Sequence, residues 1–452
     1  MSLAGSNNYL QLFPSNQTSN GTISYRDGNP VMSFILGEQD RYLIGSSVRL
    51  VGNISIYKSP NGDFGNIPLV GEDLTVSPKL STYGMLDQIV ITSQKNKSVI
   101  EHVRHYGRYL ASYLPAISSV QEANGHLGVT ANTMNNVNAN NLQYVNNQNG
   151  SSGTDRAFRG NSFCINLPTG FLNSKEPIGL SGRGWGVGGI QFDIHLASDS
   201  QFLTSTGGAF INAFYQLSDV SLICEVINPS VDQLSSLMRQ TSNSMEYNAI
   251  SSYYTTIASS NAIINFRLGL SRVLGIFMNF IPSVYLNNLN FDSFQCSPLI
   301  NDLAAAELAP IKQIIFTKGG ERLPLMYNLD ANVRDNATST VADPQIFRNY
   351  MNCFMPYMKN IKNQLSPVTY NRIGSTSQNL RAEAGDMFGV GIAFDNISGE
   401  GIDFRSENFG LQMETGLTAD NPHSAFLFVR SKQTLVMNAN GLQVISELNN
   451  FF

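Results

Sequence analysis

The sequence contains an internal repeat whose period is close to half of its 452 residues. Three short patterns recur in the same order, at separations of 225, 241 and 221 residues. They pair residues 88–92 with 313–317, 109–115 with 350–356, and 189–193 with 410–414. Chance accounts for any one of these matches, because the patterns are short, but three in order favour a duplicated folding unit. The length also exceeds what a single hydrophobic core usually supports, so we expect two domains.

The repeated patterns predict the same local structure in both copies. The first and third pairs have the β-branched and alternating apolar residues of strands. The middle pair predicts helices that end at Pro115 and Pro356. Five apolar residues in the first copy share the spacing of one helix face: Val99, Val103, Tyr106, Leu110 and Tyr113. Ser98 and Glu101 form a capping-box pattern at the start of that helix, and Pro344 suits the first turn of the second helix.

The rest of the chain predicts many short strands joined by turns rich in Gly, Asn and Ser. Further strand candidates are residues 42–57, 163–167, 191–196, 221–227, 263–270, 273–280, 425–429 and 442–445. Strands dominate this pattern, and the few helices fall in loops. We therefore predict an all-β chain with a β-sandwich or jelly roll in each half and short helices in the loops.

The composition of the connecting segments predicts where the domains begin and end. We expect a first jelly-roll domain at residues 30–228 and a second at 245–452. Residues 229–244 combine a short helix candidate with a polar run and are expected to form the linker. Residues 1–29 are rich in turn formers, so we expect an N-terminal arm outside the first sandwich.

Asparagine is concentrated in one long polar segment, residues 132–149. Loops of this length without secondary structure are uncommon unless they carry function or are disordered. Neutral amides can form hydrogen bonds across an interface with a smaller desolvation penalty than charges. We expect this segment to be a loop ordered by a neighbouring subunit, and the alternative is a disordered surface loop.

The charge balance excludes a basic nucleic-acid-binding protein. The chain has 28 Lys and Arg against 33 Asp and Glu, a net charge of −5, and only 13% of its residues are charged. Its polar side chains are mainly amides and hydroxyls, including 49 Asn, and a further 38 residues are Gly. This composition suits turns, strands and protein–protein contacts rather than the neutralisation of phosphates.

The cysteines and the apolar segments bear on the cellular compartment. Cys164, Cys224, Cys296 and Cys353 are far apart and form no dense disulfide framework, so we expect reduced and mostly buried thiols. The first residues lack the pattern of a signal peptide, and we expect synthesis in a reducing compartment. The longest apolar stretch, residues 273–286, is shorter than the roughly 20 residues that span a bilayer, so no membrane span is expected.

Side chains suited to catalysis or metal binding are scarce in this sequence, which has five His residues. His102 and His105 are three residues apart on the predicted helix, but no Cys or carboxylate cluster beyond Glu101 completes a metal site. His195 and His423 lack the neighbouring His and carboxylate ligands of a bicupin enzyme. We expect no catalytic residue, no cofactor and no metal site, and the chain is not predicted to be an enzyme.

Two further segments resemble ligand sites without meeting their requirements. The glycine-rich run at residues 182–189 lacks the Lys-Ser/Thr of a phosphate-binding P-loop and precedes a predicted strand, so we expect a flexible turn. Asp395, Glu400 and Asp403 form an acidic cluster, but they lack the alternating pattern of a dedicated calcium loop.

The two β-rich halves, the helices in matching loops, the Asn-rich segment and segments such as residues 214–222 together resemble a known family. They are similar to the double jelly-roll major capsid proteins of double-stranded DNA viruses, especially those of virophages and polinton-like viruses. The resemblance covers nearly the whole chain after about residue 30. It implies an all-β fold of two tandem jelly-roll β-sandwiches, a double jelly roll with short helices in the loops, in which both jelly rolls stand upright. It also implies homotrimers of pseudohexameric outline that tile an icosahedral shell.

The same resemblance implies the partners and the location of the protein. The partners would be further copies of the chain, neighbouring capsomers, and penton and minor capsid proteins. Sequence-specific nucleic-acid binding is not expected. The protein would be made in the host cytoplasm or a viral factory and would reside in the virion.

Two other classes of protein remain open at this stage. A viral fibre, a spike or a lectin-like receptor- or glycan-binding protein would also be β-rich. Sugar sites commonly stack on aromatic rings, and Trp185 is the only Trp, although the 18 Tyr residues could serve instead. A jelly-roll enzyme is disfavoured because the paired His ligands are missing.

Overall fold

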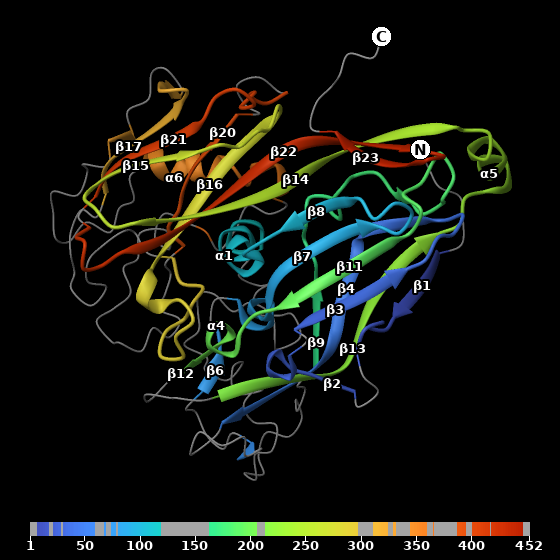
Figure 1. Cartoon of the computed structure of the whole chain (residues 1–452), viewed down its shortest axis with the longest axis horizontal. Helices are drawn as coiled ribbons and strands as arrows, with labels where there is room; N and C mark the ends of the chain where they lie inside the picture. Colours follow the sequence, from blue (N-terminus) through green and yellow to red (C-terminus); the bar gives the residue numbers. More distant parts are fainter. Residues whose placement is uncertain are drawn as a thin grey trace.

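The structure of the chain is a computed structural model. It describes residues 7–17, 21–28, 30–58, 67–68, 74–77, 80–118, 162–205, 213–296, 311–323, 329–330, 344–358, 365, 387–394, 400–415 and 417–445. Figure 1 shows two β-sandwiches: the N-terminal strands form one, the C-terminal strands form the other, and helix α1 lies between them. The Asn-rich segment 132–149 lies outside the described residues.

The first sandwich consists of two antiparallel sheets, which we call sheet 1 and sheet 2. Sheet 1 has the strand order β1-β13-β4-β10, and β2, β5 and β9 pair beside this path. Its strands are β1 (Asn7–Leu12), β2 (Thr22–Ile23), β4 (Tyr42–Lys58), β5 (Ile67–Pro68), β9 (Ser162–Asn166), β10 (Ile178–Gly179) and β13 (Ala213–Ile227). Sheet 2 has the order β3-β11-β7-β8, with β3 (Val31–Leu36), β7 (Leu86–Ser93), β8 (Val99–Val103) and β11 (Ile190–Leu196). A separate pair joins β6 (Leu74–Val76) and β12 (Leu203–Ser205).

The second sandwich has the same plan, with sheets that we call sheet 3 and sheet 4. Sheet 3 has the order β14-β22-β16-β20, and sheet 4 has the order β15-β21-β17-β18. The strands of sheet 3 are β14 (Ser242–Ile257), β16 (Val273–Pro282), β20 (Val390–Ala393), β22 (His423–Asn438) and β23 (Gly441–Ile445), which pairs with β22. Those of sheet 4 are β15 (Asn261–Phe266), β17 (Ile311–Lys318), β18 (Glu321–Leu323), β19 (Leu329–Asp330) and β21 (Phe409–Thr415).

The two sandwiches have the same topology. If the eight main strands of each are numbered along the chain, one sheet has the order 1-8-3-6 and the other has the order 2-7-4-5, with β9 and β10 sharing position 6 in the first sandwich. This is the jelly-roll arrangement. The repeated sequence patterns fall at matching places: β7 and β17 are both strand 4, and β11 and β21 are both strand 7. The fold predicted from the sequence, two tandem jelly rolls, is therefore confirmed.

Short helices lie in the connections of both sandwiches. Among the described residues, the α-helices are α1 (Tyr106–Ile117), α4 (Asp199–Phe202), α5 (Val231–Leu237) and α6 (Pro344–Asn352). The 3-10 helices are η1 (Tyr25–Asp27), η2 (Ser81–Met85), η4 (Ser283–Tyr285) and η5 (Met355–Tyr357). Helices α1 and α6 both lie between strands 5 and 6 of their sandwich, and they contain the second repeated pattern, which in the second copy runs on into η5.

The predicted start of the first helix is wrong. Residues Val99–Val103 form strand β8, which pairs with β7, because completing the edge of sheet 2 outweighs their helical spacing. Helix α1 begins only at Tyr106, after His105 in a left-handed conformation (φ 52°). Glu101 therefore caps no helix. Pro115 lies inside α1, which continues to Ile117, so Pro115 is not its stop.

Two expectations about the connecting segments also differ from the structure. Residues Asn7–Leu12 form β1, which pairs along its whole length with β13, so this part of the predicted arm 1–29 is an edge strand of the first sandwich. The last polar residues of the predicted linker 229–244 begin β14, because their backbones pair with β22 from Ser242 onward. The short helix expected within that linker is present as α5, and Ser230 and Gln233 form its capping box.

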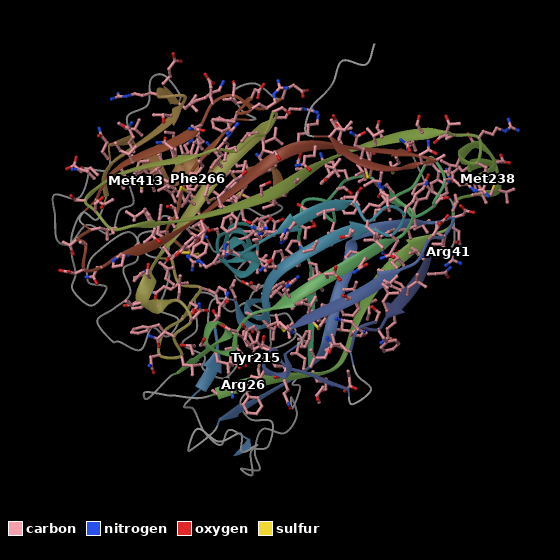
Figure 2. All side chains as sticks on the ribbon, viewed as in Figure 1. Arg26, Arg41, Tyr215, Met238, Phe266 and Met413 are labelled. Atoms are coloured by element: carbon pink, nitrogen blue, oxygen red, sulfur yellow. The ribbon has the colours of Figure 1, made fainter. Side chains whose placement is uncertain are left out.

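Both sandwiches are filled with apolar side chains, and strand alternation explains how. In β11 every second residue is buried between the sheets, as in β15. Figure 2 shows Phe266 of β15 and Met413 of β21 in the second sandwich, whereas Arg26 and Tyr215 lie at the far end of the first. There Arg26 forms an ion pair with Asp199 at 2.8 Å and donates to the carbonyl of Ala213.

Candidate functional site: the interface between the sandwiches

The residues considered as ligands in the sequence do not converge in the structure. His102 is on β8 and contacts the side chain of Gln88 on β7 at 3.1 Å, whereas His105 packs on Phe426 with ring centroids 5.0 Å apart. The two histidines are therefore not on one helix face. His195 lies on β11, and His423 is buried at the start of β22. Across the described ranges, no three His, Cys, Asp or Glu side chains gather as a metal site.

The acidic cluster is divided between two ion-paired groups. Arg272 contacts Glu400 at 2.7 Å and Glu246 at 3.0 Å. Asp403 pairs with Arg405 at 2.6 Å. Asp395 lies outside the described residues. Arginine thus neutralises the carboxylates of Glu400 and Asp403.

The glycine-rich run is a turn that leads into β11, as expected, and its residues are closely packed. A Cβ atom on Gly184 would lie 2.3 Å from the backbone of Thr241, which precedes β14. Trp185 is buried and packs beside Tyr42, with ring centroids 5.2 Å apart. This turn of the first sandwich therefore lies against the chain that leads into the second sandwich.

The principal polar site joins the two sandwiches through Arg108 of α1. Its side chain is 1% exposed. The guanidinium donates to the carbonyls of Ser293 (3.1 Å) and Gln295 (2.7 Å) and to Oδ1 of Asn279 (2.7 Å) on β16. Asn279 returns a hydrogen bond to the carbonyl of Arg108 at 2.8 Å. Burial lowers the pKa of Arg108, and the oxygen acceptors of the second sandwich hold its charged side chain.

A second buried charge, Glu101 of β8, joins the sandwiches at another point. Its carboxylate accepts from the backbone N–H groups of Phe171 (2.8 Å), Gly170 (3.1 Å) and Ile250 (2.8 Å). Ile250 belongs to β14, the edge strand of sheet 3, whose outward N–H groups would otherwise lack partners. Desolvation raises the pKa of Glu101, and these N–H donors oppose that shift. The carboxylate of Glu101 in the first sandwich thus accepts a hydrogen bond from the edge strand β14 of the second sandwich.

Gly170 shows how closely the backbones approach beside Glu101. A Cβ atom at this position would lie 1.8 Å from the carbonyl oxygen of Asn248 in β14. Tyr247 of the same strand donates its hydroxyl to the carbonyl of Ile100 at 2.7 Å and packs edge-on against Phe171. Only glycine at position 170 allows this contact between the backbones.

Aromatic rings fill the rest of the interface. Tyr109 of α1 contacts Phe277 of β16 and Phe428 of β22, with ring centroids 6.2 and 5.7 Å apart. Tyr113, one turn later in α1, stacks on Tyr109 and meets Tyr357 edge-on at 5.4 Å. Such pairs add to the hydrophobic stabilisation of the buried area. Helix α1 therefore occupies the outer face of sheet 3 as a hydrophobic element.

The turn between β7 and β8 extends the contact to the end of β22. Lys95 donates to the carbonyl of Asn438 at 3.1 Å, and Asn96 donates to that of Leu442 at 2.8 Å. Ser98 reaches the same Leu442 carbonyl at 3.2 Å. Because the interface combines buried charges, backbone contacts and aromatic packing along its length, it fixes the second sandwich relative to the first.

Sequence reasoning did not identify Arg108 or Glu101 as interface residues. Arg108 is a charge among apolar residues, after Tyr106 and Gly107 and before Tyr109, whereas Glu101 is followed by His102 and Arg104. Charged residues are seldom fully buried unless they have partners, so the apolar surroundings are a signal that could have marked Arg108 but not Glu101.

Solved structures of viral proteins align with nearly the whole chain. A chain of the Sputnik virophage structure, determined by electron cryomicroscopy, aligns with a TM-score of 0.58 and 11% identity over 100% of this chain and 92% of that one. PBCV-1 VP54, fitted into a reconstruction of the virophage Sputnik, aligns with a TM-score of 0.56 and 10% identity over 98% and 97%. The Faustovirus major capsid protein gives 0.53 and 8% identity over 97% and 91%.

The chain has the double jelly-roll fold of these viral proteins. No protein-family model matches the sequence, and no curated protein matches it either. The double jelly roll is thus recognised from the order of its strands and from alignments that cover nearly all of both chains. The sequence identities of these alignments are too low to show the similarity by themselves. None of the described helices of this double jelly roll has the length and apolarity that a bilayer crossing requires.

Proposed function

We propose that this chain is the major capsid protein of a double-stranded DNA virus. The observation that carries the proposal is the double jelly-roll fold, which aligns over at least nine-tenths of both chains with the Faustovirus major capsid protein and with PBCV-1 VP54. The internal duplication supports it. A subunit of two like sandwiches presents six similar units when three copies form a ring, and such a trimer packs as a hexamer does.

The rigid interface between the sandwiches suits this role. A shell subunit must hold its two sandwiches at a constant angle, since a small angular error is repeated at every contact between neighbours. The buried hydrogen bonds of Arg108 and Glu101 fix that angle without a cofactor. We therefore propose a structural rather than an enzymatic function. We also place the boundary between the two jelly rolls in the segment from Asn228 to Thr241, between β13 and β14.

The charge of the chain supports the proposed partners. With a net charge of −5 and few charged residues, copies of the chain repel one another only weakly. The same composition offers little positive charge for binding the phosphates of a genome. The partners in this proposal are other copies in homotrimers, neighbouring capsomers, and penton and minor capsid proteins. The protein resides in the virion after synthesis in the host cytoplasm or a viral factory.

The alternative of a glycan-binding fibre or spike protein has less support. Trp185, the only Trp, is 1% exposed and cannot stack on a sugar. Exposed aromatic side chains do occur among the described residues, at Tyr9 of β1 and the nearby Phe13, at Tyr25 of η1 and at Tyr254 of β14, so they lie in three separate places.

Negative-stain electron microscopy of the purified, expressed chain tests the proposal. We expect trimeric particles of hexagonal outline, and sheets or shells of these particles at high concentration. A glycan array provides the complementary measurement. Particles that stay monomeric at all concentrations and bind one class of glycan would support the fibre or lectin alternative instead.

A further inference from the structure

Strand β15 is an edge strand of sheet 4, the sheet of the second sandwich that lies away from α1. Helix α1 and Glu101 of the first sandwich contact sheet 3. Among the described residues, β15 pairs only with β21. Figure 1 shows both strands at the left of the molecule, with the first sandwich on the right. The contact between the two sandwiches therefore does not involve this edge.

The backbone pairing of β15 shows which of its groups point outward. Thr415 donates its backbone N–H to the carbonyl of Ser260 at 2.7 Å, at the position just before β15 begins. Hydrogen-bonded and non-hydrogen-bonded pairs alternate along an antiparallel ladder. The N–H and C=O groups of Asn261, Ile263 and Asn265 therefore point away from β21. Within the described part of the chain, those of Ile263 and Asn265 have no hydrogen-bond partner.

The equivalent edge of the first sandwich is covered by a segment of the chain itself. Strand β3 is strand 2 of that sandwich, as β15 is of the second. Ser15 donates its N–H to the carbonyl of Ser33 at 2.7 Å, and Ser33 donates its N–H to Oδ1 of Asn16 at 2.9 Å. Asn16 and Gln17 both donate to the carbonyl of Val31 at 2.8 Å. An uncharged segment thus bonds to two outward-pointing residues of β3.

The connection between β14 and β15 is too short to do the same. Residues 13–30 join strands 1 and 2 of the first sandwich, whereas residues 258–260 alone join them in the second. Three residues span at most about 11 Å, and here they make the turn between the two sheets. This connection therefore cannot run back along the edge of β15.

The side chains of β15 also show an uncovered edge. Its inward-facing residues Ala262, Ile264 and Phe266 are 6%, 9% and 7% exposed, whereas the inward-facing residues of β3 are at most 1% exposed. Ile263 projects from the outer face and is 70% exposed. Native edge strands are commonly protected by a charge, a proline or a bulge, and β15 has none of these.

We propose that the edge of β15 binds an extended segment of another polypeptide as an added strand. The backbone of this segment bonds to the outward N–H and C=O groups of Ile263 and Asn265, as in other complexes formed by strand addition. The inference rests on the proposed capsid function for the identity of that polypeptide, which in a shell is a minor capsid protein.

The two faces of β15 define the side chains that the added strand carries. Residues directly opposite each other on neighbouring strands share a face and contact each other. Apolar side chains of the segment cover Ala262 and Ile264 at the rim of the core, and another apolar side chain lies opposite Ile263. Small polar side chains lie opposite Asn261 and Asn265. The expected partner is therefore an uncharged segment with three apolar residues between two polar ones.

A synthetic peptide of this pattern is the first probe. It has the core Thr-Val-Ile-Val-Thr, a lysine at each end for solubility, and a fluorescent label, and its anisotropy is measured during titration with the purified chain. In an antiparallel register, N-methylation of the central Ile removes the donor to the carbonyl of Ile263 and should weaken binding by about tenfold. N-methylation of the preceding Val, whose N–H points away from β15, is the control and should have little effect. A peptide that does not bind, or that is insensitive to the central methyl group, contradicts the proposal.

Hydrogen exchange shows which amides the peptide covers. In the chain alone, the amides of Ile263 and Asn265 should exchange fast, whereas those of Ala262 and Ile264 are bonded to β21 and should exchange slowly. The bound peptide should slow the first pair by about tenfold or more and leave the second pair unchanged. If the first pair is already protected in the chain alone, another segment of the same chain covers the edge and the assignment is wrong.

The variant Ile263→Lys tests the site from the other side. Lysine on an edge strand opposes strand addition, so the affinity for the peptide should fall by about tenfold or more. The thermal midpoint should stay the same, because this side chain is exposed. Gln412→Lys is the matched control, since Gln412 is exposed and lies opposite Ile263 on the central strand β21. An equal loss of affinity in both variants would show that charge on this face, rather than the edge, decides binding.

The outcomes separate this inference from the proposed function. If the chain forms trimers but does not bind the peptide, the assignment of the edge is wrong and the capsid proposal stands. If it binds the peptide but forms no trimer, the edge is a strand-addition site and its partner is not a capsid protein. If the chain associates with itself and Ile263→Lys abolishes that association, the occupant is a second copy and the assignment to another polypeptide is wrong.

Discussion

The substitution Arg108→Met tests whether the interface between the sandwiches depends on its buried cation. Methionine retains much of the side-chain length and removes every N–H donor. The carbonyls of Ser293 and Gln295 and the side-chain oxygen of Asn279 then lose the donors that now lie 2.7 to 3.1 Å away. The contact of the guanidinium with the ring of Phe426, 5.0 Å from its centroid, is also lost.

The expected change in the free energy of unfolding follows from these contacts. Hydrogen bonds from a charged donor contribute about 1.5–3 kcal/mol each, so three of them contribute roughly 5–9 kcal/mol. The cost of desolvating the Arg108 charge, whose Nε has no hydrogen-bond partner, offsets part of this contribution. Breaking a buried polar pair from one side typically costs about 3–5 kcal/mol, and we expect Arg108→Met to lie in that range.

Urea unfolding followed by the fluorescence of Trp185 measures this change, because this residue is the only Trp and is buried. The control Arg405→Met removes an exposed ion pair with Asp403 and should cost less than about 1 kcal/mol. If Arg108→Met also costs less than about 1 kcal/mol, the guanidinium does not hold the sandwiches together and the reasoning is refuted.

Three further substitutions test other parts of the structure. Gly170→Ala should lower the midpoint of thermal unfolding or prevent soluble expression, since its Cβ would lie 1.8 Å from the carbonyl oxygen of Asn248, and an unchanged midpoint would contradict this close approach. Burial lowers the pKa of His423 to about 4, so the free energy of unfolding should fall as the pH drops from about 6.5 to about 4, by roughly 3 kcal/mol, and this slope should vanish in His423→Gln. Desolvation raises the pKa of Glu101, so the folded state binds this proton more tightly than the unfolded chain does. The free energy of unfolding should therefore decline as the pH rises from the ordinary pKa of a glutamate toward the raised one, and an equal slope in Glu101→Gln would contradict this.

Sequence patterns predicted the fold because a duplicated chain shows each signal twice. The first and third repeated patterns fall on strands at equivalent positions of the two sandwiches. Patterns confined to one copy were less reliable. The helical spacing from Val99 to Tyr113 suggested one helix, but β8 takes its first five residues, since the pairing of β8 with β7 is a tertiary contact that local spacing does not contain.

The edge strand β1 was missed for a related reason. Residues Asn7–Leu12 lie next to turn formers, and their pairing partner β13 is more than 200 residues away in the sequence. The interface was missed in the same way: Arg108 reaches Asn279, and Glu101 reaches Ile250, across 171 and 149 residues. Contacts of this range depend on the completed fold, so the sequence shows Arg108 only as a charge among apolar neighbours and gives no comparable signal for Glu101.

Single-particle electron cryomicroscopy of the purified chain tests the central claim most directly. We expect a trimer with six upright sandwiches around its threefold axis, in which Arg108 and Glu101 join the two sandwiches of each subunit. Particles without threefold symmetry, or subunits whose sandwiches are not joined at Arg108 and Glu101, would contradict it.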